Sequence, residues 1–344
     1  MAPPDDLASR VALALEEADF HGVVVVDGPD GTEVEVARGE ADRGAHLPMT
    51  PASRFGIASV SKLFTAVALL RQVERGEADL DAPLVGWLPD DRRPTTLDGA
   101  ATLRHFLTHR SGITDYFDEQ GDEPYEAIWQ RVPAAAMRTS RDMLSLFRDL
   151  PPRASPGAEV RYSDAAFVVL GNVVEHLAGV PLPAAIRREV FEPAGMTASG
   201  YPALDDIEPD LALGYLPPDD RDPRWRSHVL SLPAVGGGDG GAVSNAADLV
   251  RFLRALRDER FIRNPLLAEA LTPSVDDPDG GSYGLAFFIY GEGARRATGH
   301  TGEDPGYSAR ALWYREADVR LVVLSNVTEA AGPVRGAVEA LRFG

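Results

Sequence analysis

One segment of the sequence predicts a helix that is apolar on nearly every side. Residues 59–76 (SVSKLFTAVALLRQVERG) carry Leu, Phe, Ala or Val at most positions, and Gly76 is suited to the C-cap. A helix that is hydrophobic all round is buried in the body of a protein rather than laid on its surface. We therefore expect this helix in the core of the fold.

The only lysine of the chain, Lys62, lies in the first turn of this helix, and the other 33 basic residues are arginines. An arginine stays protonated, whereas a buried lysine can lose its proton and act as a base. Ser59 lies three positions earlier on the same helix face, at the N-terminal end where free N–H groups and partial positive charge point. The pair is suited to nucleophilic catalysis, with Lys62 taking the proton of Ser59 and the Ser59 amide holding an oxyanion. The simpler alternative is that Ser59 is an N-cap and Lys62 a surface residue.

Strand patterns lie mainly at the two ends of the chain, and helical patterns lie between them. Strands are expected at 21–28, 32–39, 54–58, 283–291, 307–315 and 319–327, and helices at 7–19, 101–108, 141–149, 164–178, 247–258 and from about 333. This order predicts an α/β fold of the α+β type. Residues 1–76 and 235–344 would together form one α/β domain, and residues 77–234 an inserted, mostly helical domain.

Tyr162-Ser163-Asp164 stands at the start of the helix predicted for 164–178. A tyrosine phenol near a protonated lysine can have its pKa lowered toward the phenolate, and it can then act as a general base or return a proton to a leaving group. The alternative is a half-buried tyrosine before a helix that Ser163 or Asp164 caps.

Gly299-His300-Thr301-Gly302 lies between strand-like segments. A glycine at a strand edge lets a backbone N–H approach a substrate closely. The alternative is a turn with a solvated histidine. The glycine cluster at 236–241 formally matches a dinucleotide-binding pattern, but no strand precedes it, so a tight turn before the next helix is expected instead.

The composition excludes several other classes of function. The formal net charge of −19 argues against binding to nucleic acid or to an anionic membrane surface. The chain has no cysteine, and its seven histidines form no H-E-x-x-H motif, so we expect neither a metal nor another cofactor. Without a signal sequence or an apolar stretch of membrane-spanning length, a cytoplasmic protein is expected. The sequence leaves the oligomeric state open.

Taken together, the Ser59-x-x-Lys62 pair, the Tyr162-Ser163-Asp164 triplet and the His-Thr-Gly strand resemble the serine β-lactamase and penicillin-binding-protein superfamily. The finer pattern is similar to the class C β-lactamase branch with its esterase and D-aminopeptidase relatives. The supporting segments are 55–70, 107–113, 156–171, 191–199, 240–256 and 299–309. The resemblance implies a β-lactamase-like fold, with an antiparallel sheet flanked by helices.

The resemblance also implies a role for each matching position. Ser59 would be the acylated nucleophile, Lys62 its activating partner and Tyr162 the acid or base that moves protons. Asp164 takes the place usually held by Asn, and His300 the place of the Lys in Lys-Thr-Gly. The substrate would lie along His300, Thr301 and Gly302, with an oxyanion hole formed by the backbone N–H groups of Ser59 and Glu303.

Two departures from the family pattern bear on the substrate. Asp164 favours the ammonium form of Lys62 and shifts the role of base toward Tyr162. His300 is mostly neutral at pH 7 and attracts a substrate carboxylate less than lysine does. We therefore expect a serine hydrolase that cleaves a small ester or amide, or a D-amino-acid derivative, through an acyl-enzyme. The alternatives are a β-lactamase or D-alanyl-D-alanine carboxypeptidase, and a homologue that senses ligands without hydrolysis.

Overall fold

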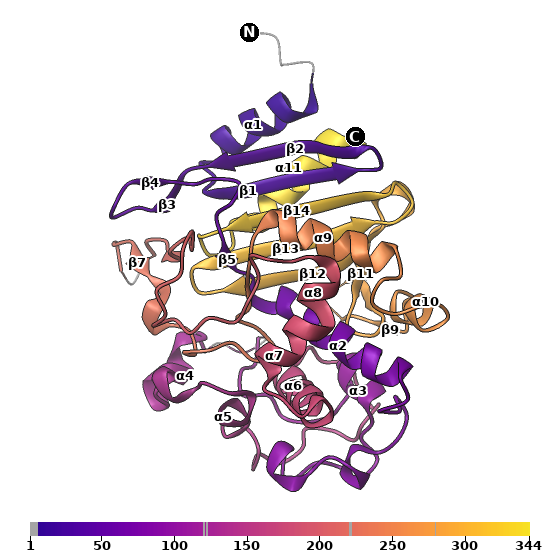
Figure 1. The fold of residues 1–344 in the computed structure, drawn as a ribbon. Helices are drawn as coiled ribbons and strands as arrows, with labels where there is room; N and C mark the ends of the chain where they lie inside the picture. The colour runs from indigo at the N-terminus through magenta and orange to yellow at the C-terminus, as the bar shows by residue number, and fades with distance from the viewer. Residues whose placement is uncertain (1–5, 120, 122, 220–221, 279) are drawn as a thin grey trace.

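An eight-stranded antiparallel sheet, in the order β2-β1-β14-β13-β12-β11-β10-β9, is the largest sheet among the described residues (Figure 1). The computed structural model describes residues 6–119, 121, 123–219, 222–278 and 280–344. The strands are β1 (Gly22–Gly28), β2 (Gly31–Arg38), β9 (Val275–Asp276), β10 (Ser282–Tyr283), β11 (Phe288–Tyr290), β12 (Ala297–Asp304), β13 (Tyr307–Tyr314) and β14 (Val319–Ser325). The N-terminal hairpin pairs with the last strand, with Val24 opposite Val323, so both chain ends build one sheet.

Helices cover both faces of this sheet, which confirms the predicted fold class. Successive side chains of a strand point to opposite faces, so the valine run of β1 is buried on both sides. Val24 and Val26 pack with α1 (Leu7–Glu17) and α11 (Ala331–Phe343), whereas Val23 and Val25 belong to the larger core of the other face. That core also contains α9 (Ala246–Arg257) and α2 (Lys62–Glu74).

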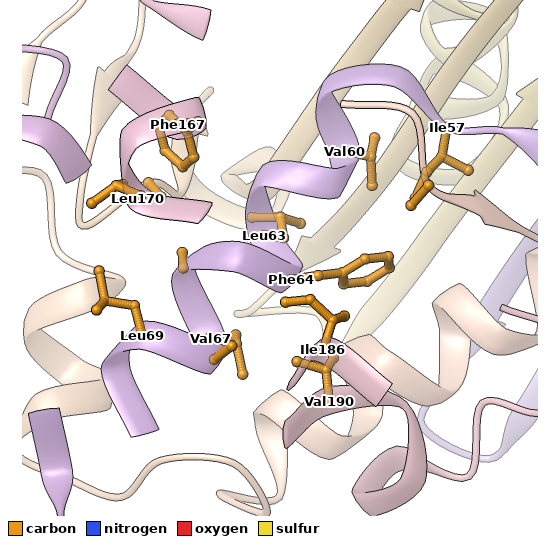
Figure 2. Packing of buried hydrophobic residues seen from close by; sticks show 14 of the residues in the cluster. Ile57, Val60, Leu63, Phe64, Val67, Leu69, Phe167, Leu170, Ile186 and Val190 are labelled. Carbon is orange, nitrogen blue, oxygen red and sulfur yellow. The ribbon is translucent and has the colours of Figure 1, made fainter. Parts of the chain in front are cut away.

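The all-round apolar helix lies in the larger core, as predicted, and its residues from Lys62 to Leu70 are fully buried. Figure 2 shows α2 between helices that contribute Phe167, Leu170, Ile186 and Val190. These helices are α6 (Asp164–Ala178), α7 (Leu182–Ile186) and the π-helical turn η5 (Arg187–Phe191). The start of the helix differs from the prediction, because residues Ala58–Ser61 form a 3-10 turn, η1, before α2 begins.

The remaining elements are short. The helices are α3 (Leu103–Leu107), α4 (Glu126–Arg131), α5 (Ser140–Leu144), α8 (Glu192–Ala194) and α10 (Leu266–Ala270), and the strands β3 (Glu40–Asp42), β4 (Leu47–Pro48), β5 (Phe55–Gly56), β6 (Tyr215–Leu216), β7 (Arg226–Ser227) and β8 (Val243–Ser244). The single strand predicted for 283–291 is broken into β10 and β11, because Ala286 has a left-handed φ of +72°. The division into two domains at residues 76 and 235 stays a prediction.

Within the described residues, no single helix has the length and hydropathy to cross a membrane. One bent pair, α6 with the segment Leu182–Ala194, passes on length and composition together, with a bend of 73°.

Candidate active site

Ser59 follows a residue in a left-handed backbone conformation. The Ile57 N–H donates to the carbonyl of Ala242 at 2.9 Å, and Ala58 then has a φ of +46°, a region that few residues with a side chain adopt. Ser61 holds this turn together, because its hydroxyl donates to the carbonyl of Ala58 at 2.7 Å and accepts from the N–H of Ala242 at 3.1 Å. The turn places Ser59 in the lining of a cavity, partly exposed.

Lys62 makes three hydrogen bonds, as many as an ammonium group has protons. Its Nζ donates to Oγ of Ser59 at 2.8 Å, to Oδ1 of Asp164 at 2.5 Å and to the backbone carbonyl of Asp239 at 2.8 Å. Burial by itself lowers the pKa of the ammonium, but Asp164 and Asp239 outweigh burial, and the net pKa is raised. Lys62 is therefore a buried ammonium group that is hydrogen-bonded to the candidate nucleophile.

The phenol of Tyr162 lies beside the Lys62 ammonium, and His109 contacts this tyrosine. Nζ of Lys62 is 4.9 Å from the centre of the Tyr162 ring, and the centre of the His109 ring is 4.6 Å from it, with the two rings tilted by 30°. His109 also binds the backbone on both sides of the tyrosine. Its carbonyl accepts from the N–H of Arg161 at 2.9 Å, and its Nδ1 accepts from the N–H of Ser163 at 3.1 Å.

The pKa of Tyr162 is raised, not lowered as the sequence suggested. Burial raises the pKa most, and the carboxylates of Asp164 and Glu119 raise it further, against a smaller lowering by a hydrogen bond with Ser59. The prediction considered only the lysine, but the structure gathers several carboxylates around the same phenol. Tyr162 is therefore a neutral phenol in this state, suited to donate a proton.

Two further aspartates face this cluster. Asp239 is 6% exposed, its Oδ2 accepts from the hydroxyl of Tyr116 at 2.5 Å, and burial followed by the charge of Asp164 raises its pKa to about 6. Asp115 accepts from the N–H of Ala165 at the start of α6, and the same two causes raise its pKa to about 7. The region around Ser59 and Lys62 thus has an excess of carboxylates.

Strand β12 packs against the turn η1 that carries Ser59. An added Cβ at Gly302 would lie 2.5 Å from the carbonyl oxygen of Ile57 and 3.0 Å from the nitrogen of Ser59, so only glycine allows this approach. Pairing with β11 ends at Gly299, so the next residues of β12 have no strand partner on that edge among the residues that the structure describes. Thr301 lies between His300 and Gly302 on this open stretch, and Glu303 follows.

The side chains of His300 and Glu303 have different surroundings. His300 is 2% exposed, its Nδ1 lies 2.5 Å from the carbonyl oxygen of Thr301, and burial followed by the charge of Lys62 lowers its pKa to about 3. The imidazole is therefore neutral, as expected. The carboxylate of Glu303 instead pairs with Arg310 at 2.7 Å and accepts from the hydroxyl of Ser308 at 2.8 Å.

A cavity of about 370 Å³ opens at Ser59. Its acidic lining residues are Glu119, Glu126, Asp164, Asp239, Glu303, Asp304 and Glu329, and among the described residues no Lys, Arg or His lines it. Apolar side chains of Tyr116, Phe117, Tyr125, Met143 and Leu232 form much of the rest. No group of three or more His, Asp or Glu side chains in the described part of the chain is arranged to hold a metal ion.

The structure brings Ser59, Lys62, Tyr162 and Asp164 together, with β12 alongside. Sequence reasoning did not single out His109, Tyr116, Asp239 or Asp304, which also belong to this region. His109 lies within the family-like segment 107–113, which was a usable signal. The glycine cluster at 236–241 is a turn, as expected, but its Asp239 carbonyl proves to be a partner of Lys62.

Comparisons with known proteins agree on one family. The family model described as Beta-lactamase matches residues 7–342. Esterase EstB of Burkholderia gladioli is 32% identical over 75% of this chain and 71% of its own length, and penicillin-binding protein 4* of Bacillus subtilis is 26% identical over 96% and 74%. The crystal structure of a penicillin binding protein from Bacillus halodurans superposes with a TM-score of 0.90 at 33% identity, covering 96% of this chain and 99% of the other.

Proposed function

We propose that this chain cleaves small esters or amides through an acyl-enzyme on Ser59. The chain belongs to the β-lactamase family and is a serine hydrolase of that family. The observation that carries this proposal is the hydrogen bond of 2.8 Å between Nζ of Lys62 and Oγ of Ser59. It joins a partly exposed hydroxyl in a cavity to a buried group that can move a proton.

Acylation begins with a proton shift along two hydrogen bonds that the structure contains. One ammonium proton of Lys62 first moves to Oδ1 of Asp164 over 2.5 Å, which leaves a neutral amine. The amine then rotates about its Cε–Nζ bond so that its lone pair faces Oγ of Ser59, 2.8 Å away, and takes the hydroxyl proton. Oγ of Ser59 then forms a bond to the substrate carbonyl carbon, and the carbonyl oxygen becomes an oxyanion. The backbone N–H groups of Ser59 and Glu303 are the proposed donors to that oxyanion.

The leaving group departs with a proton from Tyr162. The raised pKa keeps this phenol protonated, so it can donate as the carbon–leaving-group bond breaks, and Lys62 then returns a proton to it. Deacylation uses the same groups in reverse. A water molecule gives one proton to Lys62, which has just returned its own proton to Tyr162, and the hydroxide oxygen bonds to the acyl carbon. The bond from that carbon to Oγ of Ser59 then breaks, and Ser59 regains its hydroxyl proton from Lys62.

Ser59→Ala tests the nucleophile. We expect the variant to lose hydrolysis of a p-nitrophenyl ester and to lose the mass increase that a fluorophosphonate probe gives on wild-type protein. Ser9→Ala is the matched control, because Ser9 is exposed on α1, on the far face of the sheet. Hydrolysis and labelling that persist in Ser59→Ala and match those of the control would refute the proposal.

The same assays separate the two alternatives. A penicillin-type substrate carries a carboxylate, which would meet a neutral His300 and a cavity lined by carboxylates, so we expect nitrocefin turnover far below ester turnover. Nitrocefin rates that rival the ester rate would favour a β-lactamase or carboxypeptidase. A stable acyl adduct in intact-mass spectra, with no turnover of any substrate, would favour a ligand-sensing homologue.

A further inference from the structure

We propose that the substrate carries a cationic group, a free ammonium, on its acyl portion, and that Asp304 with Asp239 binds this cation. This proposal rests on the proposed function, since it names the substrate class of the Ser59 site.

The charge of the cavity is unbalanced. Lys62 is the only cation in contact with the site among the described residues, and it is already paired with Asp164 at 2.5 Å. Arg310 pairs with Glu303. Asp239 and Asp304 also line the cavity, and neither has an ion-pair partner in the described part of the chain. A buried carboxylate without a counter-charge is unfavourable, and a bound cation removes that penalty.

Asp239 offers a specific acceptor. The side chain is 6% exposed, its Oδ2 is taken by the hydroxyl of Tyr116, and its Oδ1 is buried with no hydrogen-bond partner among the described residues. Buried polar atoms are nearly always paired in folded proteins, so an unpaired carboxylate oxygen in the lining of a cavity indicates a ligand with a donor. An ammonium supplies both the donor and the compensating charge.

Asp304 lies on the reactive face of β12. Side chains alternate along a strand, so Gly302 and Asp304 point to one face and Glu303 to the other. Gly302 touches the turn of Ser59, and Asp304 is one strand repeat further on, about 7 Å along the chain direction. Burial raises the pKa of Asp304 well above its usual range, and the nearby Asp164 adds to the rise. A bound ammonium would therefore take the place of the proton that otherwise neutralises this side chain.

The position of Tyr162 assigns the acyl side. His300 and Asp304 lie on opposite sides of Gly302 along β12. Tyr162, the proposed proton donor to the leaving group, is near the His300 end, with ring centres 6.1 Å apart. The leaving group therefore lies toward His300, and Asp304 is left at the acyl end. Tyr116, Phe117 and Tyr125 line the same cavity and give it an apolar surface, which suits an ammonium beside an apolar side chain.

The test compares substrates that differ only in the charge. The D and L forms of phenylalanine p-nitroanilide carry the ammonium, and 3-phenylpropionyl p-nitroanilide lacks it. The p-nitrophenyl esters of 6-aminohexanoate and heptanoate form a second pair. We expect kcat/KM to favour the charged member of at least one pair by about tenfold or more, the size typical of a hydrogen bond to a charged group. Equal or lower rates for the charged member of both pairs would overturn the proposal.

The variants Asp304→Asn and Asp239→Asn test which side chains bind the substrate ammonium. Each should reduce the preference for the charged substrate several-fold, and Asp276→Asn, an exposed aspartate on the far strand β9, should not. A preference that persists in both variants would also overturn the assignment.

A binding measurement that needs no turnover completes the test. Phenylalanine amide should bind to Ser59→Ala more tightly than 3-phenylpropionamide, and equal affinities would count against the cation site. Failure of this inference can be told apart from failure of the proposed function. If wild-type protein turns over neutral esters through Ser59 without any charge preference, only this inference fails, whereas absence of all Ser59-dependent turnover defeats the proposed function itself.

Discussion

Replacing Lys62 with methionine removes the buried cation but keeps an unbranched side chain of similar length. The change deletes the hydrogen bonds to Ser59, Asp164 and Asp239 and leaves the Asp164 carboxylate, 12% exposed, without its counter-ion. Removing one partner of a buried ion pair destabilises a protein by about 3–5 kcal/mol. An unfolding entropy of about 2.1 cal/mol/K per residue gives about 0.7 kcal/mol/K for 344 residues, so we expect Tm at pH 8 to fall by about 4–7 °C.

Adding Asp164→Asn to Lys62→Met shows whether the uncompensated charge causes the loss of stability. In Lys62→Met with Asp164→Asn, the uncompensated carboxylate is gone, so we expect at least about one third of the lost stability to return. Arg153→Met is the matched control, because its ion pair with Glu159 is 44% and 46% exposed and contributes less than about 1 kcal/mol. Calorimetric Tm values of the three variants and of wild type, at pH 8 and pH 5, provide the comparison.

The pH dependence has a definite sign. At pH 5 the neighbouring carboxyls, including Asp239 with its pKa of about 6, take up protons, so loss of Lys62 should lower Tm less than at pH 8. A Lys62→Met protein as stable as wild type at pH 8 would refute the reasoning. So would a double variant no more stable than Lys62→Met, because the penalty would then come from lost packing rather than from charge.

Four further outcomes are expected. Asp239→Asn should stabilise the protein by up to about 3 kcal/mol at pH 8 and should have no effect near pH 3. The pKa of this carboxyl rises from 3.8 to about 6 on folding, so ionisation of Asp239 destabilises the folded protein as the pH rises through that window. Measurement of Tm against pH for the variant and wild type tests this. His109→Phe keeps a ring but loses the Ser163 N–H acceptor, so kcat should fall about tenfold with KM little changed in steady-state kinetics. Gly302→Ala should abolish ester turnover and lower Tm, since its Cβ would clash with the turn of Ser59. Lys62→Arg should lower kcat/KM by about a thousandfold while circular dichroism stays native, and activity within a few-fold of wild type would contradict the proton-transfer role.

The local patterns of the sequence predicted most of the framework. The valine run of β1 and the all-round apolar helix both indicated burial on two sides, and both are buried in this way. The start of the helix was misplaced because Ala58 adopts a left-handed conformation, which nothing in its side chain announces. The break at Ala286 was missed for the same reason. Backbone conformations that the surrounding fold imposes on ordinary residues leave no sequence pattern.

The site was only half predictable for a different reason. Ser59 and Lys62 are close in sequence, so their spacing alone placed them on one face. Asp239 reaches Lys62 through a backbone carbonyl from 177 positions away, and a backbone acceptor can belong to any residue type. The direction of the Tyr162 pKa was wrong because it depends on the sum of several charges, and the sequence does not show which carboxylates the fold brings near the phenol.

The geometry around Nζ explains why a chain with 33 arginines keeps one lysine. The three acceptors of Lys62 come from three separate segments, and the ammonium is fully buried among them. Three N–H bonds that diverge from one small nitrogen can reach acceptors in three directions, whereas a guanidinium holds its donors in one wider plane. A guanidinium also keeps its proton, so it could pair with Asp164 but could not pass a proton from Ser59 toward it. The position therefore requires both the compact shape and the exchangeable proton, and only lysine combines them.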